Sequence, residues 1–271
     1  MCINFQKLIK GERYSQTINY IKSRINTLPK ISIILGSGLG IIENQINEKI
    51  SVDMKDIPYY PVPTVSGHHG KIVFGKMGNK NVMAIFGRSH YYEGIGLEKV
   101  VLPILLLYKL DIKKVIITNA AGAVNPNFRI GDLVLLNGYI NFTQLNIFKN
   151  NWEKSIQNPF SLSLNNKIVQ SNLPVKPKTG TYCWTTGPSY ESPAEVKFIR
   201  YLGGDLVGMS TIPEAFMAKR LGLDVIGISF VSNLAVGLAE KPLSHKEVKK
   251  SVLSNKENFS IFIYKVVTEI L

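Results

Sequence analysis

The sequence predicts a single domain of the α/β class, on three observations. Short apolar runs typical of strands alternate with longer segments typical of helices, which favours a largely parallel or mixed sheet covered by helices. A hydrophobic content of 45% over 271 residues is sufficient for a substantial core. No internal repeat or long linker divides residues 1–271, so one domain is expected.

The expected strands are apolar runs bounded by turn residues. They lie at 31–35, 72–75, 82–86, 115–118, 133–136, 205–208 and 224–230. The expected helices follow the helical spacing of apolar residues. They lie at 98–109, 193–202, 213–221 and 246–270, after an N-terminal helical extension over residues 1–27.

Residues 141–179 interrupt this alternation. The interval is polar, rich in asparagine and weakly periodic, and Pro159, Pro174 and Pro177 would break any long element. We expect an irregular excursion, which is either a surface loop or a lid or subunit-contact loop.

The composition narrows the classes of function. Lysine and arginine number 32 against 19 acidic residues, a net charge of +13, but the lysines are scattered without a basic block, so no nucleic-acid partner is expected. A diffuse positive field would still attract a phosphate-bearing substrate, although a drift in composition explains the charge equally well.

The chain shows no signal for a membrane or for secretion. The first twenty residues lack the apolar core of a signal peptide, and no apolar run is long enough to span a bilayer. Cys2 and Cys183 provide neither a disulfide framework nor a metal-binding spacing. A cytoplasmic location with reduced thiols is therefore expected.

The loop IILGSGLG at 33–40 raises the question of an anion site. Gly36, Gly38 and Gly40 follow a buried strand, so backbone N–H groups there could face a ligand closely. A dinucleotide fingerprint would need glycine where Ile41 stands, and the Gly-Lys-Ser/Thr of a Walker A loop is missing. A tight turn without a ligand remains an alternative.

Polar segments flanked by glycine follow most of the predicted strands, at the edge where open α/β sheets bind ligands. They are LGSGLG at 35–40, SGHHGK at 66–71, GRSHYYEG at 87–94, TNAAGAVNP at 118–126, TGPSYES at 186–192, GMSTIPE at 208–214 and VSNLAVG at 231–237.

Within these segments, four side chains predict an anion site that needs no metal ion. Arg88 can hold an oxyanion through two N–H groups, and His90 points the same way if the segment is extended. Ser37 and Ser210 offer hydroxyl groups. Three of them also have a purely structural interpretation: a surface ion pair for Arg88, a core histidine for His90, and a helix cap for Ser210.

Other catalytic centres are disfavoured by spacing. GPSYE and GMSTI lack the second glycine of a G-x-S-x-G nucleophile elbow. The histidines His68, His69, His90 and His245 show no spacing typical of metal ligands. No metal and no cysteine nucleophile is expected.

Six segments in order, ILGSGLG, GHHGKIVFG, GRSHYYEG, TNAAGAVNPNFRIGDLVLL, GTYCWTTGPSYESPAE and VGMSTIPEAFMAKRLGL, resemble the trimeric class of purine nucleoside phosphorylases. The resemblance implies a mixed, barrel-like sheet flanked by helices and a homotrimer. It also implies phosphorolysis of purine ribonucleosides and 2′-deoxyribonucleosides, such as inosine and guanosine, to the free base and the sugar 1-phosphate. Inorganic phosphate is then a co-substrate, and no cofactor is required.

The resemblance also assigns site residues, motif by motif. The implied phosphate-binding residues are Ser37, His68, Arg88, His90, the backbone of Ala120, and Ser210. The implied purine and ribose contacts are Tyr92, Tyr190, Glu191, Met209, Asn233 and His245. His68, Glu191 and Asn233 take the implied catalytic roles.

The chemistry of this assignment is coherent. Departure of a purine from C1′ leaves positive charge on the sugar and negative charge on the base, so an anion below the ribose and a donor at N7 stabilise the transition state. Asn233 can donate to N7, and Glu191 can accept N1–H of hypoxanthine or guanine. Adenine has no N1–H, so a preference for 6-oxopurines is expected.

Departures from the family pattern leave alternatives open. Phe160, in a shortened 141–179 segment, is a candidate for the aromatic residue that reaches a neighbouring subunit. Ser232 stands where threonine is common, His69 replaces a small residue, and Tyr190 replaces phenylalanine. A xanthosine-preferring phosphorylase is thus an alternative. Methylthioadenosine phosphorylases carry aspartate where Asn233 stands, and a non-catalytic nucleoside or nucleic-acid binding protein would leave the anion site unexplained.

Overall fold

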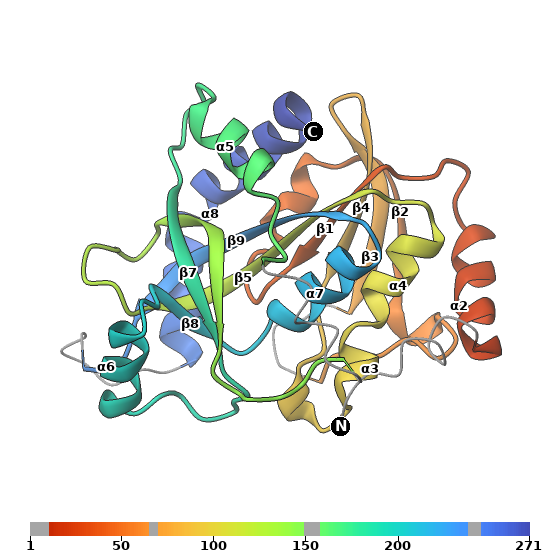
Figure 1. The fold of residues 1–271 in the computed structure, drawn as a ribbon. Helices are drawn as coiled ribbons and strands as arrows, with labels where there is room; N and C mark the ends of the chain where they lie inside the picture. The colour runs from red at the N-terminus through yellow and green to blue at the C-terminus, as the bar shows by residue number, and fades with distance from the viewer. Residues whose placement is uncertain (1–10, 65–69, 149–157, 238–244) are drawn as a thin grey trace.

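The structure, a computed structural model, describes residues 11–64, 70–148, 158–237 and 245–271, of which 245–254 are described by backbone alone (Figure 1). Within these residues the strands form one nine-stranded sheet in the order β2-β3-β4-β1-β5-β8-β7-β6-β9. Their bounds are β1 Ile31–Leu35, β2 Asn47–Asp53, β3 Lys71–Met77, β4 Lys80–Phe86, β5 Lys114–Ala123, β6 Leu133–Asn141, β7 Lys178–Trp184, β8 Leu206–Gly208 and β9 Asp224–Leu234.

The sheet is open at one end and closed into a ring at the other. Strand β1 is parallel to both β4 and β5, while β3 runs antiparallel to both of its neighbours, β2 and β4. Strand β5 pairs with β8 at one end and with β9 along its length, so β5, β8, β7, β6 and β9 close on themselves. This mixed, barrel-like sheet confirms the predicted fold class.

Helices cover both sides of the sheet (Figure 1). Their bounds are α2 Glu12–Lys22, α3 Leu97–Val100, α4 Leu102–Lys109, α5 Leu162–Gln170, α6 Pro193–Tyr201, α7 Ile212–Arg220 and α8 His245–Lys265. Short 3₁₀ turns lie at Gly40–Gln45, Met54–Asp56 and Tyr91–Glu93, and a π turn at Val266–Ile270 ends α8.

The first strand shows why these strands read as continuous apolar runs. Ile34 on one face of β1 lies in a core cluster with Leu105 of α4 and Phe216 of α7. Ile33 on the other face lies in a second cluster with Phe262 of α8. A strand buried on both faces needs apolar residues at every position, which is the pattern that the sequence displays.

All seven expected strands are present, but β2 and β7 were missed. Five of the seven residues of β2 are exposed, because this edge strand pairs only with β3. The strands were predicted from apolar runs, which mark buried strands. An exposed edge strand has no such run. The expected helix 98–109 divides into α3 and α4 at Val101, two residues before Pro103, which sits in the first turn of α4.

The interval 141–179 is more ordered than expected. It contains α5, which buries Leu164 and Ile168, and Asn165 donates from Nδ2 to the carbonyl of Leu136 at 2.9 Å. The signal that was missed is the four-residue spacing of Leu164 and Ile168, which places both on one face of a helix. Residues 149–157 of this interval lie outside the described part.

The proposed role of Phe160 at a neighbouring subunit is wrong. Its side chain is 2% exposed within this single chain. A Cβ atom at Gly227 of β9 would lie 2.5 Å from Phe160 Cε1, so the ring packs directly on that strand. A ring already covered by its own chain cannot line a site on another copy.

Over the described ranges, we find no helix with the length and apolar character needed to cross a membrane.

Candidate active site

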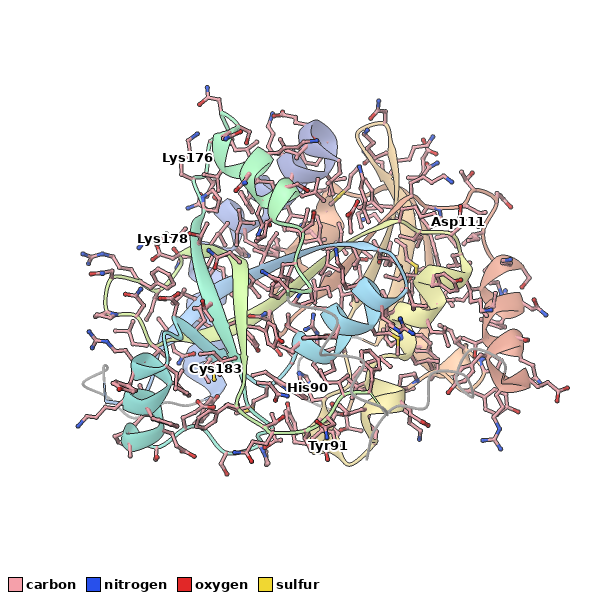
Figure 2. The ribbon with its side chains drawn as sticks, viewed as in Figure 1. His90, Tyr91, Asp111, Lys176, Lys178 and Cys183 are labelled. Carbon is pink, nitrogen blue, oxygen red and sulfur yellow. The ribbon has the colours of Figure 1, made fainter. Side chains whose placement is uncertain are left out.

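One pocket gathers most of the predicted site residues at the carboxyl ends of the strands. Ten of them line it: Ser37, Arg88, His90, Tyr92, Ala120, Tyr190, Glu191, Met209, Ser210 and Asn233. Strand β7 runs from Lys178 to Trp184, and Figure 2 labels Lys178 near its start and Cys183 near its end. The label of His90 lies on the side of the molecule where β7 ends. The predicted residue His68 lies outside the described residues, and His245 begins α8 but its side chain is not described.

The glycine loop after β1 packs on β5. The N–H of Gly36 donates to Oγ1 of Thr118 at 3.1 Å, and a Cβ atom at Gly36 would lie 2.7 Å from Cα of Asn119. Only glycine allows this approach of two backbones. Ser37, the next residue, and Ala120 of β5 both line the pocket.

Arg88 forms a buried ion pair behind the pocket. Its Nη1 lies 3.1 Å from Oε2 of Glu214, and the two side chains are 3% and 1% exposed. Nη1 also donates to the hydroxyl groups of Ser210 at 3.1 Å and Thr211 at 3.2 Å. The alternative of a surface ion pair is therefore wrong for Arg88.

The second terminal nitrogen of Arg88 also faces protein oxygens. Nη2 donates to the carbonyl of Thr118 at 2.5 Å and to that of Ile34 at 3.4 Å. The expected grip of an anion by two N–H groups of Arg88 thus requires some of these bonds to be exchanged. What the observed arrangement supplies is a guanidinium group fixed at the pocket wall, with Glu214 behind it as the counter-ion.

A tight turn at Thr211 sets the geometry beside this charge. Thr211 has φ 72° and ψ −52°, and the N–H of Ile212 donates to the carbonyl of Ser210 at 2.8 Å. These values define a γ-turn, which is strained for a β-branched residue. The side-chain amide of Asn119 donates from Nδ2 to Thr211 Oγ1 at 2.9 Å, which supports the turn. Thr211, and not Ser210, is the N-cap of α7.

His90 is held by an ionised carboxylate. Its Nδ1 lies 3.1 Å from Oε1 of Glu93, and its ring stacks on Tyr92 at 4.9 Å between centroids. Burial raises the pKa of Glu93, but hydrogen bonds from His90 and Thr64 outweigh burial and lower that pKa to about 2. The Glu93 carboxylate therefore orients His90 over the whole physiological pH range.

The pocket also carries groups suited to a flat, polar ring. Tyr190 is 42% exposed, and Glu191 accepts a hydrogen bond at Oε1 from Thr185 Oγ1 at 2.9 Å. Burial raises the pKa of Tyr92 to about 12, so its phenol stays protonated and can donate.

A one-residue bulge in β9 places Asn233. Ala121 of β5 is paired with Val231 and Gly122 with Asn233, so Ser232 is the extra residue. Ser232 donates from Oγ to Asn233 Oδ1 at 2.8 Å. The amide oxygen is thereby engaged, and Nδ2 donates one N–H to the carbonyl of Leu234 at 3.2 Å, which leaves its second N–H for a ligand. A bulge re-aims side chains in this way.

Sequence reasoning missed the residues that hold the site residues in place. They are Glu93, Asn119, Thr185, Thr211 and Glu214. Ser232 was named only as a departure from the family pattern, without its bond to Asn233. The pair Thr211 and Glu214 carries the spacing of a capping box, which was a readable signal. That spacing predicts a helix start, but not that the carboxylate is buried against Arg88.

No group of three or more histidine, cysteine, aspartate or glutamate side chains suited to a metal ion occurs in the described part of the chain.

Comparison with known proteins agrees with this geometry. The family model described as the phosphorylase superfamily matches residues 30–268. Purine nucleoside phosphorylase 1 of Bacillus subtilis is 40% identical over 269 residues, covering 95% of this chain and 98% of that protein. The same enzyme of Geobacillus stearothermophilus is 39% identical, covering 93% and 95%.

A solved structure shows the same fold. Isoform 2 of purine nucleoside phosphorylase from Schistosoma mansoni, in complex with cytosine and ribose-1-phosphate, superposes with a TM-score of 0.87. It is 33% identical and covers 97% of this chain and 98% of its own. From the family match, the identities and the shared fold, we conclude that the chain belongs to the purine nucleoside phosphorylase family of the phosphorylase superfamily.

Proposed function

We propose that this protein catalyses the phosphorolysis of purine ribonucleosides and 2′-deoxyribonucleosides, such as inosine and guanosine, to the free base and the sugar 1-phosphate. One observation carries the proposal: a buried positive charge with hydroxyl groups and a carboxylate–amide pair line the same pocket. The first set suits inorganic phosphate and the second suits a purine. Ribose-1-phosphate is bound by the Schistosoma mansoni relative.

In the phosphate half, Ser37, Ser210 and the backbone N–H of Ala120 donate to the phosphate oxygens. His90 donates from Nδ1 to the Glu93 carboxylate, so in the neutral imidazole Nε2 is an acceptor and takes a hydrogen bond from the protonated oxygen of hydrogen phosphate. Arg88 supplies the charge that holds the anion. Phosphate then attacks C1′ of the ribose as the bond to N9 of the purine breaks, and its own negative charge stabilises the positive charge that develops on the sugar.

In the purine half, Asn233 donates from Nδ2 to N7, where negative charge collects as the base leaves. This assignment is supported by the hydrogen bond that engages Asn233 Oδ1 with Ser232. Glu191 accepts N1–H through the carboxylate oxygen that Thr185 leaves available. Tyr190 covers the face of the base.

The roles of the remaining residues follow the family resemblance. Tyr92 and Met209 contact the ribose, His245 meets the 5′-hydroxyl, and His68 lies near the phosphate. The assembly proposed is a cytoplasmic homotrimer that works without a cofactor, with residues 1–27 as an N-terminal extension of the single domain. Light scattering coupled to gel filtration measures the oligomeric state.

Cleavage of inosine should require inorganic phosphate. With phosphate present, we expect hypoxanthine and ribose 1-phosphate in equal amounts, because the pocket offers an anion site where the nucleophile must lie. Product analysis with and without phosphate measures this. Release of free ribose at the same rate without phosphate would show a hydrolase and refute the proposal.

Adenosine should be a poor substrate. An ionised carboxylate at position 191 faces a lone pair at N1 of adenine, and such an unpaired contact can lower kcat/KM by roughly 10⁴-fold. Rates with inosine, guanosine, xanthosine and adenosine, measured at one phosphate concentration, give the ranking. Equal kcat/KM for adenosine and inosine at neutral pH would contradict the role of Glu191.

A further inference from the structure

Thr185 touches the residue that reads the purine, yet neither the strand pattern nor the family motifs assign it a role. It follows the last residue of β7 and is buried, with 9% of its surface exposed. Its backbone N–H donates to the carbonyl of Gly208 at 2.9 Å, which ties it to β8. The position of its side chain is therefore set by the barrel.

The hydroxyl of Thr185 has two acceptors within reach. Oε1 of Glu191 lies at 2.9 Å and the carbonyl of Gly208 at 3.5 Å. A hydroxyl has one proton, and the shorter bond to a charged acceptor is the stronger. Thr185 thus donates to Glu191, which fixes Oε1 and leaves Oε2 for a ligand.

We propose that Thr185 is a positioning residue that sets purine selectivity by holding Glu191 as an ionised acceptor for 6-oxopurines. The inference rests on the proposed function and deepens it. In the absence of this hydroxyl, the Glu191 carboxyl is more readily protonated and becomes a donor, and it then suits a 6-aminopurine.

The chemistry of the two purine classes explains the switch. Hypoxanthine presents N1–H and needs an acceptor, whereas adenine presents a lone pair at N1 and needs a donor. A carboxylate accepts only, and a carboxylic acid has one O–H to donate. One side chain can therefore serve either class according to its protonation state.

The surroundings of Glu191 make this state adjustable. Burial raises the pKa of Glu191, while hydrogen bonds from its own backbone N–H and from Thr185 lower it, and the negative charge of Glu195 raises it. Among the residues that the structure describes, Tyr190 and Cys183 are the other titratable groups that interact with Glu191. Burial raises the pKa of each, that of Cys183 to about 12, so both are neutral near pH 7.

The direction of the pH dependence follows. Inosine requires ionised Glu191, so its kcat/KM is full above the pKa of Glu191 and falls as pH drops through it. Adenosine requires the protonated form and shows the opposite trend. Removal of the Thr185 hydroxyl raises the pKa of Glu191, so the acidic limb for inosine moves to higher pH.

The test is the pH profile of kcat/KM for inosine and adenosine, at saturating phosphate, from about pH 5 to about pH 9. Thr185→Val removes the hydroxyl at constant shape, and Thr185→Ala removes it in a smaller side chain, so the result does not depend on one variant folding. Thr185→Ser keeps the hydroxyl. Thr186→Val is the matched control, because Thr186 is the adjacent threonine and has no side-chain bond to Glu191.

In the valine and alanine variants, we expect the acidic limb of the inosine profile to shift to higher pH by about one unit. At a fixed pH on the acid side, this shift is a roughly tenfold loss of kcat/KM. The adenosine-to-inosine ratio should rise in the same pH range by a similar factor. Thr185→Ser should restore the wild-type profile, and Thr186→Val should leave it unchanged.

Two results would overturn the inference. One is an unchanged profile in the valine and alanine variants, and the other is an equal loss at every pH, which indicates packing alone. Both are distinct from failure of the proposed function, which is a wild-type protein that shows no phosphate-dependent cleavage of inosine at any pH.

Discussion

Replacement of Glu214 by alanine should lower the free energy of unfolding by about 3–5 kcal/mol. The reason is that Glu214 and Arg88 are both almost fully buried, with 3.1 Å between Oε2 and Nη1. Removal of the carboxylate leaves the guanidinium charge without its counter-ion in the protein interior. Denaturant unfolding followed by circular dichroism measures the change.

An exposed ion pair provides the control for this substitution. Glu269 pairs with Lys265 at the surface, where the side chains are 47% and 39% exposed. Glu269→Ala should change the free energy of unfolding by less than about 1 kcal/mol. Glu214→Gln, which keeps the shape of the side chain, should fall between the two. Equal stability of the Glu214→Ala and Glu269→Ala variants would contradict the importance of the buried pair.

Replacement of Asn233 by alanine should lower kcat/KM for inosine by about 10²–10³-fold. The amide of Asn233 is the donor that the proposed mechanism places at N7, where charge develops only as the base leaves. The loss should therefore appear mainly in kcat. Steady-state kinetics with inosine at saturating phosphate measure it.

An asparagine remote from the pocket provides the matched control. Asn172 is exposed and lies between α5 and β7. Asn172→Ala should retain wild-type kcat/KM. If Asn233→Ala behaves the same way while its circular dichroism spectrum is unchanged, Asn233 has no place in the mechanism.

Much of the fold was predictable because both faces of the central strands are buried. In β1, Ile33 packs into one core cluster and Ile34 into the other, so both must be apolar. The sequence of the strand is therefore a nearly continuous run of apolar residues. The ring of strands was expected only through the family resemblance. Its closure depends on β5 pairing with β8 and β9 at once, and no local pattern encodes long-range pairing.

The site was predictable for a related reason. Polar residues at or directly after the carboxyl ends of buried strands, such as Asn233 near the end of β9 and Arg88 after β4, gather where the strands end together. The supporting contacts were not predictable. Whether Glu214 caps a helix in solvent or neutralises Arg88 depends on the docking of α7, and whether Thr185 reaches Glu191 depends on a turn between them.

The bulge at Ser232 has a consequence for the kinds of change that β9 tolerates. The number of residues here fixes the aim of Asn233: without Ser232, β9 would pair regularly with β5 and would lose both the bulge that directs the Asn233 side chain and the hydroxyl that engages its amide oxygen. Exchange of serine for threonine at the bulge keeps that count. During evolution, insertions and deletions in this stretch should therefore be selected against more strongly than substitutions, whereas surface loops accept both.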